Sequence, residues 1–138
     1  MSIAPVPKPV FWVGPTLEAV RRFPKDVRDA IGLALFQAQT GGKHVSARPM
    51  KGFGGAGVLE VVEDHDGNAY RAVYTVRLPH AIYALHAFQK KSKRDTRTPR
   101  REIDLIRERL KRAEEHHAEW SSIREEGGTQ SEGRGPRE

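Results

Sequence analysis

The hydrophobic period of this chain changes near Arg48, and this change limits the fold to a class that combines helices with strands. Between Pro24 and Gly41, apolar residues recur every third or fourth position, as on the buried stripe of a helix. The stripe consists of Val27, Ala30, Ile31, Ala34, Leu35 and Ala38. Downstream, residues 69–78 alternate with a period of two, which is typical of a strand. One predicted face carries Tyr70, Ala72, Tyr74 and Val76, and the other carries Arg71, Val73, Thr75 and Arg77.

Turn residues divide the rest of the chain into further elements. Glycine-rich and turn-forming segments separate predicted strands over residues 48–52, 58–63, 69–78 and 81–88. A short strand (10–13) and two helices (16–23 and from Pro24 onward) precede them. Thr98 and Pro99 are typical of a helix start, with threonine as the N-cap and proline as the first helical residue. The predicted class is therefore α+β: an N-terminal strand and two helices, an antiparallel β-meander and a C-terminal helix.

The length of 138 residues predicts a single domain. Residues 1–9 are rich in proline and predict an extended arm, and residues 10–117 form the predicted domain. Residues 118–138 are rich in glutamate, serine, glycine and arginine, which predicts a disordered or frayed polar tail, although Trp120 and Ile123 are able to extend the helix.

The composition also restricts compartment and cofactors. The chain has no cysteine, which excludes a disulfide framework and thiolate metal ligands. It shows no signal-peptide pattern and no apolar run of membrane-spanning length. We therefore expect a soluble cytoplasmic protein.

The positive charge of the chain is concentrated in one window. The formal net charge is +6, and the segment from Lys90 to Arg101 contains seven basic residues and one acid, Asp95. Outside this window, basic and acidic residues are equal in number. The seven are Lys90, Lys91, Lys93, Arg94, Arg97, Arg100 and Arg101. Because the last two lie where a helix dipole disfavours cations, contact with a polyanion such as nucleic acid is favoured over a solvated basic loop.

Three further features are weaker candidates for chemistry. Arg71 in mid-strand is able to contact a ligand, but a cross-strand ion pair with Glu60 or Glu63 is favoured by sequence alone. Lys51 precedes a glycine-rich loop that lets a backbone approach a ligand closely, yet no phosphate-binding loop motif follows. His86 lies on the strand that leads to the basic window, either as a proton shuttle or as a structural sheet histidine, which is the more common case.

Lysine, arginine and histidine side chains are sufficient to cleave RNA. The 2′-hydroxyl of RNA is an internal nucleophile, so the protein supplies only a base, an acid and cations for the charge that develops on the phosphorane. The six histidines show no metal-ligand spacing, and such a reaction requires no metal. We therefore expect no metal and no cofactor.

Three segments resemble the RelE/ParE superfamily of bacterial toxins, most of all its phage-derived, HigB-like branch in type II toxin–antitoxin systems. They are residues 69–76 (AYRAVYTV), 84–93 (ALHAFQKKSK) and 98–103 (TPRREI). The resemblance extends over roughly residues 10–113. It implies a compact antiparallel sheet flanked by helices, ribosome-dependent endoribonuclease cleavage of translated mRNA, and inhibition by a cognate antitoxin, often a helix-turn-helix protein.

The resemblance also implies roles for individual residues. Lys51 and Arg71 are expected to stabilise the phosphorane charge, Phe88 to stack on a base, and Lys90 and Lys91 to anchor the RNA backbone. The additional predicted RNA-binding residues are Gln89, Lys93, Arg94, Arg100 and Arg101.

Two features leave the activity open. Many relatives carry an arginine at the position of Val62, so the expected site lacks one cation. The general base has no assignment, with His86 and Tyr74 as candidates. The alternatives are a ParE-like protein that inhibits DNA gyrase without catalysis, and a non-catalytic module that binds RNA or only the antitoxin. The basic strand end favours RNA over gyrase.

Overall fold

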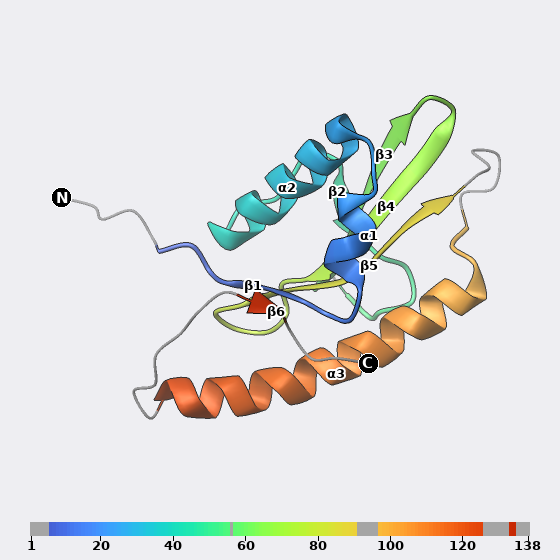
Figure 1. Cartoon of the computed structure of the whole chain (residues 1–138). Coiled ribbons are helices and arrows are strands. Elements are labelled where there is room, and N and C mark those ends of the chain that lie inside the picture. The colour runs from blue at the N-terminus through green and yellow to red at the C-terminus, as the bar shows by residue number, and fades with distance from the viewer. Residues whose placement is uncertain (1–5, 56, 91–96, 126–132, 135–138) are drawn as a thin grey trace.

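The computed structural model describes residues 6–55, 57–90, 97–125 and 133–134, and it confirms the predicted α+β class. Helices α1 (Thr16–Arg21) and α2 (Lys25–Gln39) lie on one face of a central sheet, and the long helix α3 (Arg100–Glu125) lies across the other (Figure 1). The strands are β1 (Val10–Trp12), β2 (Ala47–Pro49), β3 (Val58–His65), β4 (Asn68–Thr75), β5 (Ile82–Lys90) and β6 (Gly133–Arg134).

Within the described residues the sheet has the strand order β2-β3-β4-β5-β1-β6. Strands β2 to β5 pair in antiparallel fashion, so the predicted meander is confirmed. Strand β1 joins parallel to β5, which makes the sheet as a whole mixed and gives β5 a central position.

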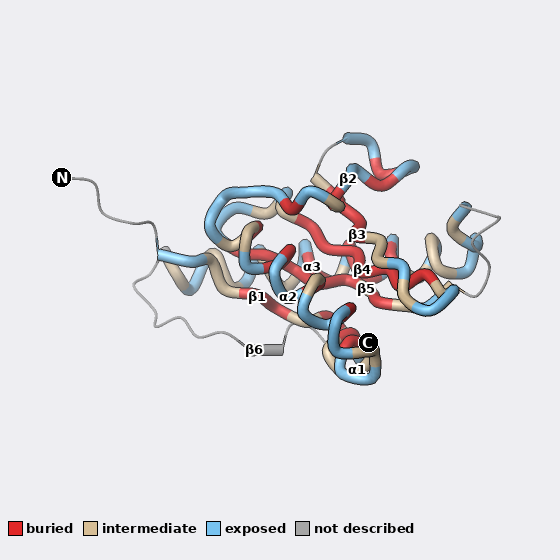
Figure 2. Tube along the Cα trace, turned by 90° about the horizontal axis from the view of Figure 1, so that it is seen from above, coloured by how far each residue is buried: buried red, intermediate tan, exposed pale blue. Residues whose placement is uncertain are grey.

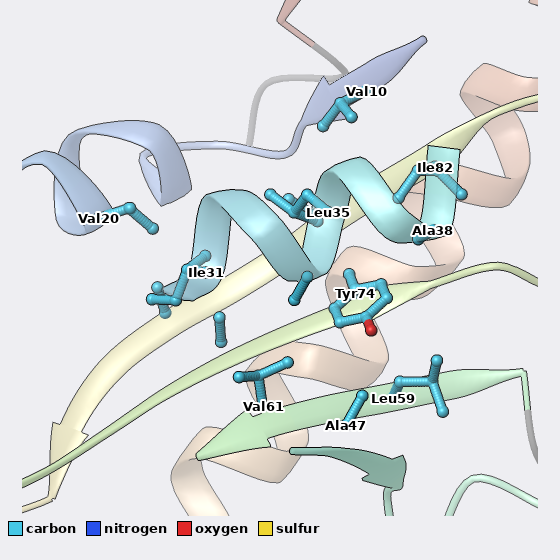
Figure 3. Close-up of a cluster of buried hydrophobic side chains, with 14 of the residues drawn as sticks. Val10, Val20, Ile31, Leu35, Ala38, Ala47, Leu59, Val61, Tyr74 and Ile82 are labelled. Atoms are coloured by element: carbon cyan, nitrogen blue, oxygen red, sulfur yellow. The ribbon is translucent and has the colours of Figure 1, made fainter. Parts of the chain in front are cut away.

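Each face of the sheet carries a hydrophobic core, and the central strands are buried between the helices (Figure 2). On one face, Ala72 and Tyr74 of β4 pack with the apolar stripe of α2 (Figure 3). On the other, Val73 belongs to a second cluster that includes Ile106 of α3. The alternation along β4 therefore separates two cores, not a core from solvent, and a charged residue on this strand is buried.

A bulge in β5 directs two consecutive residues toward α3. Val73 pairs with His86 and Tyr74 pairs with Ala84, so Leu85 has no partner across the ladder. The Leu85 carbonyl instead accepts hydrogen bonds from Nη1 of the buried Arg109, at 3.0 Å, and from Thr16 Oγ1, at 3.2 Å. Buried backbone groups require such partners, so these bonds explain how the bulge is tolerated inside the protein.

The boundaries of α3 differ from the prediction at both ends. The Pro99 carbonyl accepts the amide protons of Glu102 and Ile103, so Pro99, not Thr98, stands at the N-cap position. At the other end the helix continues to Glu125, beyond the expected boundary at His117. Trp120 lies edge-on against Phe11 with ring centroids 5.5 Å apart, and this packing is a tertiary contact that composition does not reveal.

The two ends of the chain are only partly described. Of the predicted arm, residues 6–9 are outside the helices and strands, and the Lys8 amide donates to the Gln39 carbonyl at 3.0 Å. Of the predicted tail beyond Glu125, the structure describes only β6, which pairs parallel to β1. None of the helices in the described part of the chain is both long and apolar enough to span a membrane.

Candidate functional site

An open cavity of about 480 Å³ lies between strands β2, β3 and β4 and the start of α3. Its lining contains four basic side chains and a single carboxylate among the described residues. The lining consists of Arg48, Pro49, Met50, Lys51, Glu60, Arg71, Arg97, Thr98 and Ile103. The structure therefore brings Lys51 and Arg71, two of the predicted site residues, into one pocket with a strong excess of positive charge.

Strand pairing explains why these charges converge. Arg48 lies directly opposite Glu60 in the β2–β3 register, and Arg71 lies opposite Val62, two residues further along β3. Residues directly opposite, or two apart on one strand, share a face of the sheet. Arg48, Glu60 and Arg71 consequently form one row on the face that α3 covers.

Glu60 connects the two arginines of this row. Arg71 Nη1 donates to Glu60 Oε2 at 3.2 Å, and Arg48 Nε donates to Glu60 Oε1 at 3.0 Å. Arg71 Nη1 also donates to Thr98 Oγ1 at 3.2 Å, which ties the strand to the residue that precedes Pro99. The side chain of Arg71 is 4% exposed and that of Glu60 9%, so the ion pair favoured by the sequence exists but is buried.

Lys51 reaches the pocket from a loop that α3 holds in place. Gly52 has a φ of +90°, a conformation that strains other residues, and its carbonyl accepts a hydrogen bond from Arg107 Nη2 at 2.8 Å. The Arg107 guanidinium also lies 4.7 Å from the ring centroid of Phe53, which is buried. This clamp fixes the backbone directly after Lys51.

Both ring nitrogens of His86 are occupied, and its side chain does not line the pocket. Arg109 Nη1 lies 2.9 Å from Nδ1, and a guanidinium only donates, so Nδ1 is the acceptor. The proton therefore stands on Nε2 and is donated to Glu102. This arrangement agrees with a structural sheet histidine and gives no support to His86 as a proton shuttle.

Tyr74, the other candidate for the general base, faces the wrong side of the sheet. It belongs to the core beneath α2, as Figure 3 shows, whereas the pocket opens on the α3 side. Burial raises the pKa of its hydroxyl to about 12. Tyr74 is therefore excluded as a base in this pocket, and Glu60 is the carboxylate that lines it.

Fewer residues of the basic window gather at one site than the sequence predicted. Arg97 lines the pocket, and Lys90 Nζ donates to the Arg97 carbonyl. Arg100 and Arg101 are exposed in the first turn of α3, near Asp104 and Glu102 respectively, and they do not line the pocket. The predicted site residues Lys91, Lys93 and Arg94 lie outside the described residues.

Phe88 and Gln89, which were each predicted to bind RNA, lie on opposite faces of the sheet. Phe88 is directly opposite Arg71 on the face of the pocket, where its ring stacks on His86 at a centroid distance of 5.0 Å. Gln89 is opposite Tyr70, which belongs to the core beneath α2. The structure therefore does not bring the two side chains together on one face of the sheet.

Several residues of the pocket were not predicted from the sequence. The sequence did not indicate Arg48 as a site residue, because it does not reveal the pairing register of the short strand β2. Thr98 was interpreted only as a helix cap. Val62 lies directly opposite Arg71, so an arginine at this position would stand beside the pocket. Among the described residues, no group of three or more histidine and acidic side chains is arranged to hold a metal ion.

Comparison with known proteins identifies the family. The toxin–antitoxin complex RelBE2 from Mycobacterium tuberculosis is similar in structure, with 17% sequence identity and a TM-score of 0.42, over 63% of this chain and 95% of that one. No curated protein matches the chain. The family model described as phage-derived protein Gp49-like (DUF891) matches residues 18–111, a range that includes every residue lining the pocket. Because this match extends over more than half of the sequence, the chain belongs to the phage-derived Gp49-like family.

Proposed function

We propose that this protein is the toxin of a toxin–antitoxin system and that it cleaves RNA in the pocket between β2–β4 and α3. The observation that carries this proposal is the convergence of Arg48, Lys51, Arg71 and Arg97 around the carboxylate of Glu60. Such a site offers both a base and preorganised cations for a phosphodiester. The resemblance of three sequence segments to RelE-type toxins supports the same activity.

The pocket supplies the groups that cleavage by the 2′-hydroxyl requires. Glu60 accepts hydrogen bonds from Arg48 and Arg71, but a carboxylate has about four acceptor positions, so it is able to accept the 2′-proton as well. The 2′-oxygen then attacks phosphorus, and the 5′-oxygen leaves with a proton from Lys51, which yields a 2′,3′-cyclic phosphate and a 5′-hydroxyl. Arg71 and Arg97 stabilise the charge on the phosphorane.

The resemblance supports two partners for this activity. The substrate is translated mRNA on the ribosome, and a cognate antitoxin, of the helix-turn-helix type in many relatives, inhibits the toxin. The protein then acts in the cytoplasm without a cofactor.

Expression of the full chain in a bacterial host tests the proposal. Growth is expected to stop, and primer extension is expected to detect breaks within translated transcripts. Lys51→Ala and Arg97→Ala should relieve both effects, whereas Lys111→Ala, an exposed lysine of α3 that does not line the pocket, should not. Growth arrest with intact transcripts contradicts the nuclease, and DNA breaks would identify gyrase as the target instead.

The partner is tested separately. The gene adjacent to this one is expressed together with it, and rescue of growth with recovery of a stable complex is expected. If neither neighbouring gene restores growth, the antitoxin part of the proposal is contradicted. The nuclease part is then tested by the transcript assay alone.

A further inference from the structure

The pocket has an apolar wall that phosphate chemistry does not explain. Pro49, Met50 and Ile103 line it beside the cations. Met50 is only 4% exposed and belongs to the core under α3, and Ile103 packs against the same core. One edge of this core therefore opens directly into a cavity that is otherwise cationic.

The dimensions and chemistry of the pocket select a ligand with two parts. Its volume of about 480 Å³ is within the range of roughly 300–1,000 Å³ that small organic ligands occupy, so it is larger than a phosphate group requires. The basic side chains suit an anion, and the wall of Pro49, Met50 and Ile103 suits a flat apolar surface. A nucleotide carries both parts on one scaffold.

We propose that the pocket binds a single nucleotide with its base against Met50 and Ile103 and that it discriminates poorly among the four bases. This inference rests on the proposed function, because it names the part of the RNA that the cleavage site holds. A base placed on this wall gains contact with apolar atoms, as bases do on other apolar and aromatic surfaces, and every base offers such a face.

The polar side chains that line the pocket support weak discrimination among the four bases. Adenine is read mainly by asparagine or glutamine, and neither is among the described residues that line the pocket. The Thr98 hydroxyl accepts from Arg71, and the Glu60 carboxylate accepts from two arginines. The remaining polar groups are basic and suit the phosphate.

Direct binding of small probes to the wild-type protein tests the inference without a change of sequence. AMP, CMP, GMP, UMP and ribose 5-phosphate are titrated by calorimetry in one buffer of fixed salt. The four mononucleotides are expected to bind with similar affinity, and ribose 5-phosphate about tenfold more weakly, because it lacks the base. Equal affinity of ribose 5-phosphate and AMP overturns the apolar subsite, as does the absence of binding by all four mononucleotides.

A strong preference for one base overturns the inferred weak discrimination among the four bases. Guanine is the informative case, because arginine and lysine are able to pair with its edge. A GMP affinity more than about tenfold above that of the other nucleotides would mean that a basic side chain reads the base.

A matched pair of variants locates the subsite on the protein. Ile103→Ala is expected to weaken AMP binding several-fold and to leave ribose 5-phosphate binding unchanged, which also demonstrates that the variant is folded. Ile123→Ala, an exposed isoleucine on the same helix, should alter neither. An Ile103→Ala protein that binds AMP as tightly as the wild type places the base elsewhere and overturns the assignment.

The outcomes separate this inference from the nuclease. If the protein cleaves RNA but binds ribose 5-phosphate as well as AMP, the base subsite is wrong and the proposed function stands. If mononucleotides bind as expected while no transcript is cut, the subsite stands and the cleavage proposal is wrong.

Discussion

Arg71 and Glu60 form an ion pair inside the protein: Nη1 lies 3.2 Å from Oε2, and the two side chains are 4% and 9% exposed. Arg48 contacts the other oxygen of the same carboxylate, but its side chain is 57% exposed. Removal of one partner from a buried pair leaves an uncompensated charge, whereas a solvated pair contributes little. The carboxylate of Glu60 is therefore much more tightly coupled to Arg71 than to Arg48.

We predict that Glu60→Gln lowers the free energy of unfolding by about 3 kcal/mol, and that Arg48→Gln lowers it by less than about 1 kcal/mol. Urea denaturation of both variants measures these changes, and the double variant gives the coupling between the two residues. An equal loss of stability in the two single variants would mean that the pair with Arg71 is no stronger than a surface pair.

The fold was predictable because its local signals agree with its tertiary structure. The period of three to four in α2 and the alternation in β4 are direct consequences of which side chains are buried. Both elements form, although β4 ends at Thr75 and not at the predicted residue 78. The sequence left the extension of α3 to Glu125 open, because the contact that stabilises Trp120 is made with Phe11, a residue more than a hundred positions away.

A site residue was predictable only where its own sequence context indicates contact with a ligand. Lys51 and Arg71 were weak candidates by their sequence context, the resemblance gave them roles, and both line the pocket. Arg48 and the bridging role of Glu60 depend on strand register, which alternation alone does not determine. The contacts of His86 agree with the structural histidine that the sequence favoured, but the bulge at Leu85 that turns it toward Arg109 has no sequence pattern.

His86 is predicted to act in stability and not in cleavage. Because Arg109 and Glu102 occupy both ring nitrogens, His86→Gln should lower the free energy of unfolding by about 1–3 kcal/mol through loss of a buried hydrogen bond. Its rate of RNA cleavage, measured below the unfolding temperature of the variant, should be close to that of the wild type. A variant of normal stability that no longer cleaves RNA would show instead that the imidazole takes part in the reaction.

Arg107 is predicted to position Lys51 through the loop between them. Arg107→Ala removes the hydrogen bond to the Gly52 carbonyl and the contact with Phe53, so the loop is no longer fixed. Displacement of a catalytic group by about 1 Å is able to lower a rate by up to about a hundredfold, and we expect a loss of at least about tenfold in RNA cleavage.

Two further variants control this experiment. Arg107→Lys keeps the charge but not the planar group, so it should retain an intermediate rate. Arg28→Ala removes an exposed arginine from α2, on the opposite face of the sheet, and should leave the rate unchanged. If Arg107→Ala cleaves RNA at the wild-type rate, the loop holds Lys51 without help from α3.

The contact between β5 and the later turns of α3 is predicted to weaken in mild acid. His116 Nδ1 lies 2.7 Å from the hydroxyl of Tyr83, whose pKa is raised by burial, so the tyrosine keeps its proton and donates it to the imidazole. Burial lowers the pKa of His116 below its ordinary value of 6.5, and His117 adds to this effect while Glu119 opposes it. The folded protein therefore favours neutral His116.

The sign of the pH dependence follows from this shift. As the pH falls below about 6.5, the unfolded chain takes up a proton at position 116 more readily than the folded protein, so the free energy of unfolding decreases. Urea denaturation at several values between pH 8 and pH 5 measures the slope. His116→Gln keeps an acceptor for Tyr83 but does not titrate, so its slope should be smaller than that of the wild type. Identical slopes would mean that other groups cause the acid sensitivity and that protonation of His116 is equally favourable in both states.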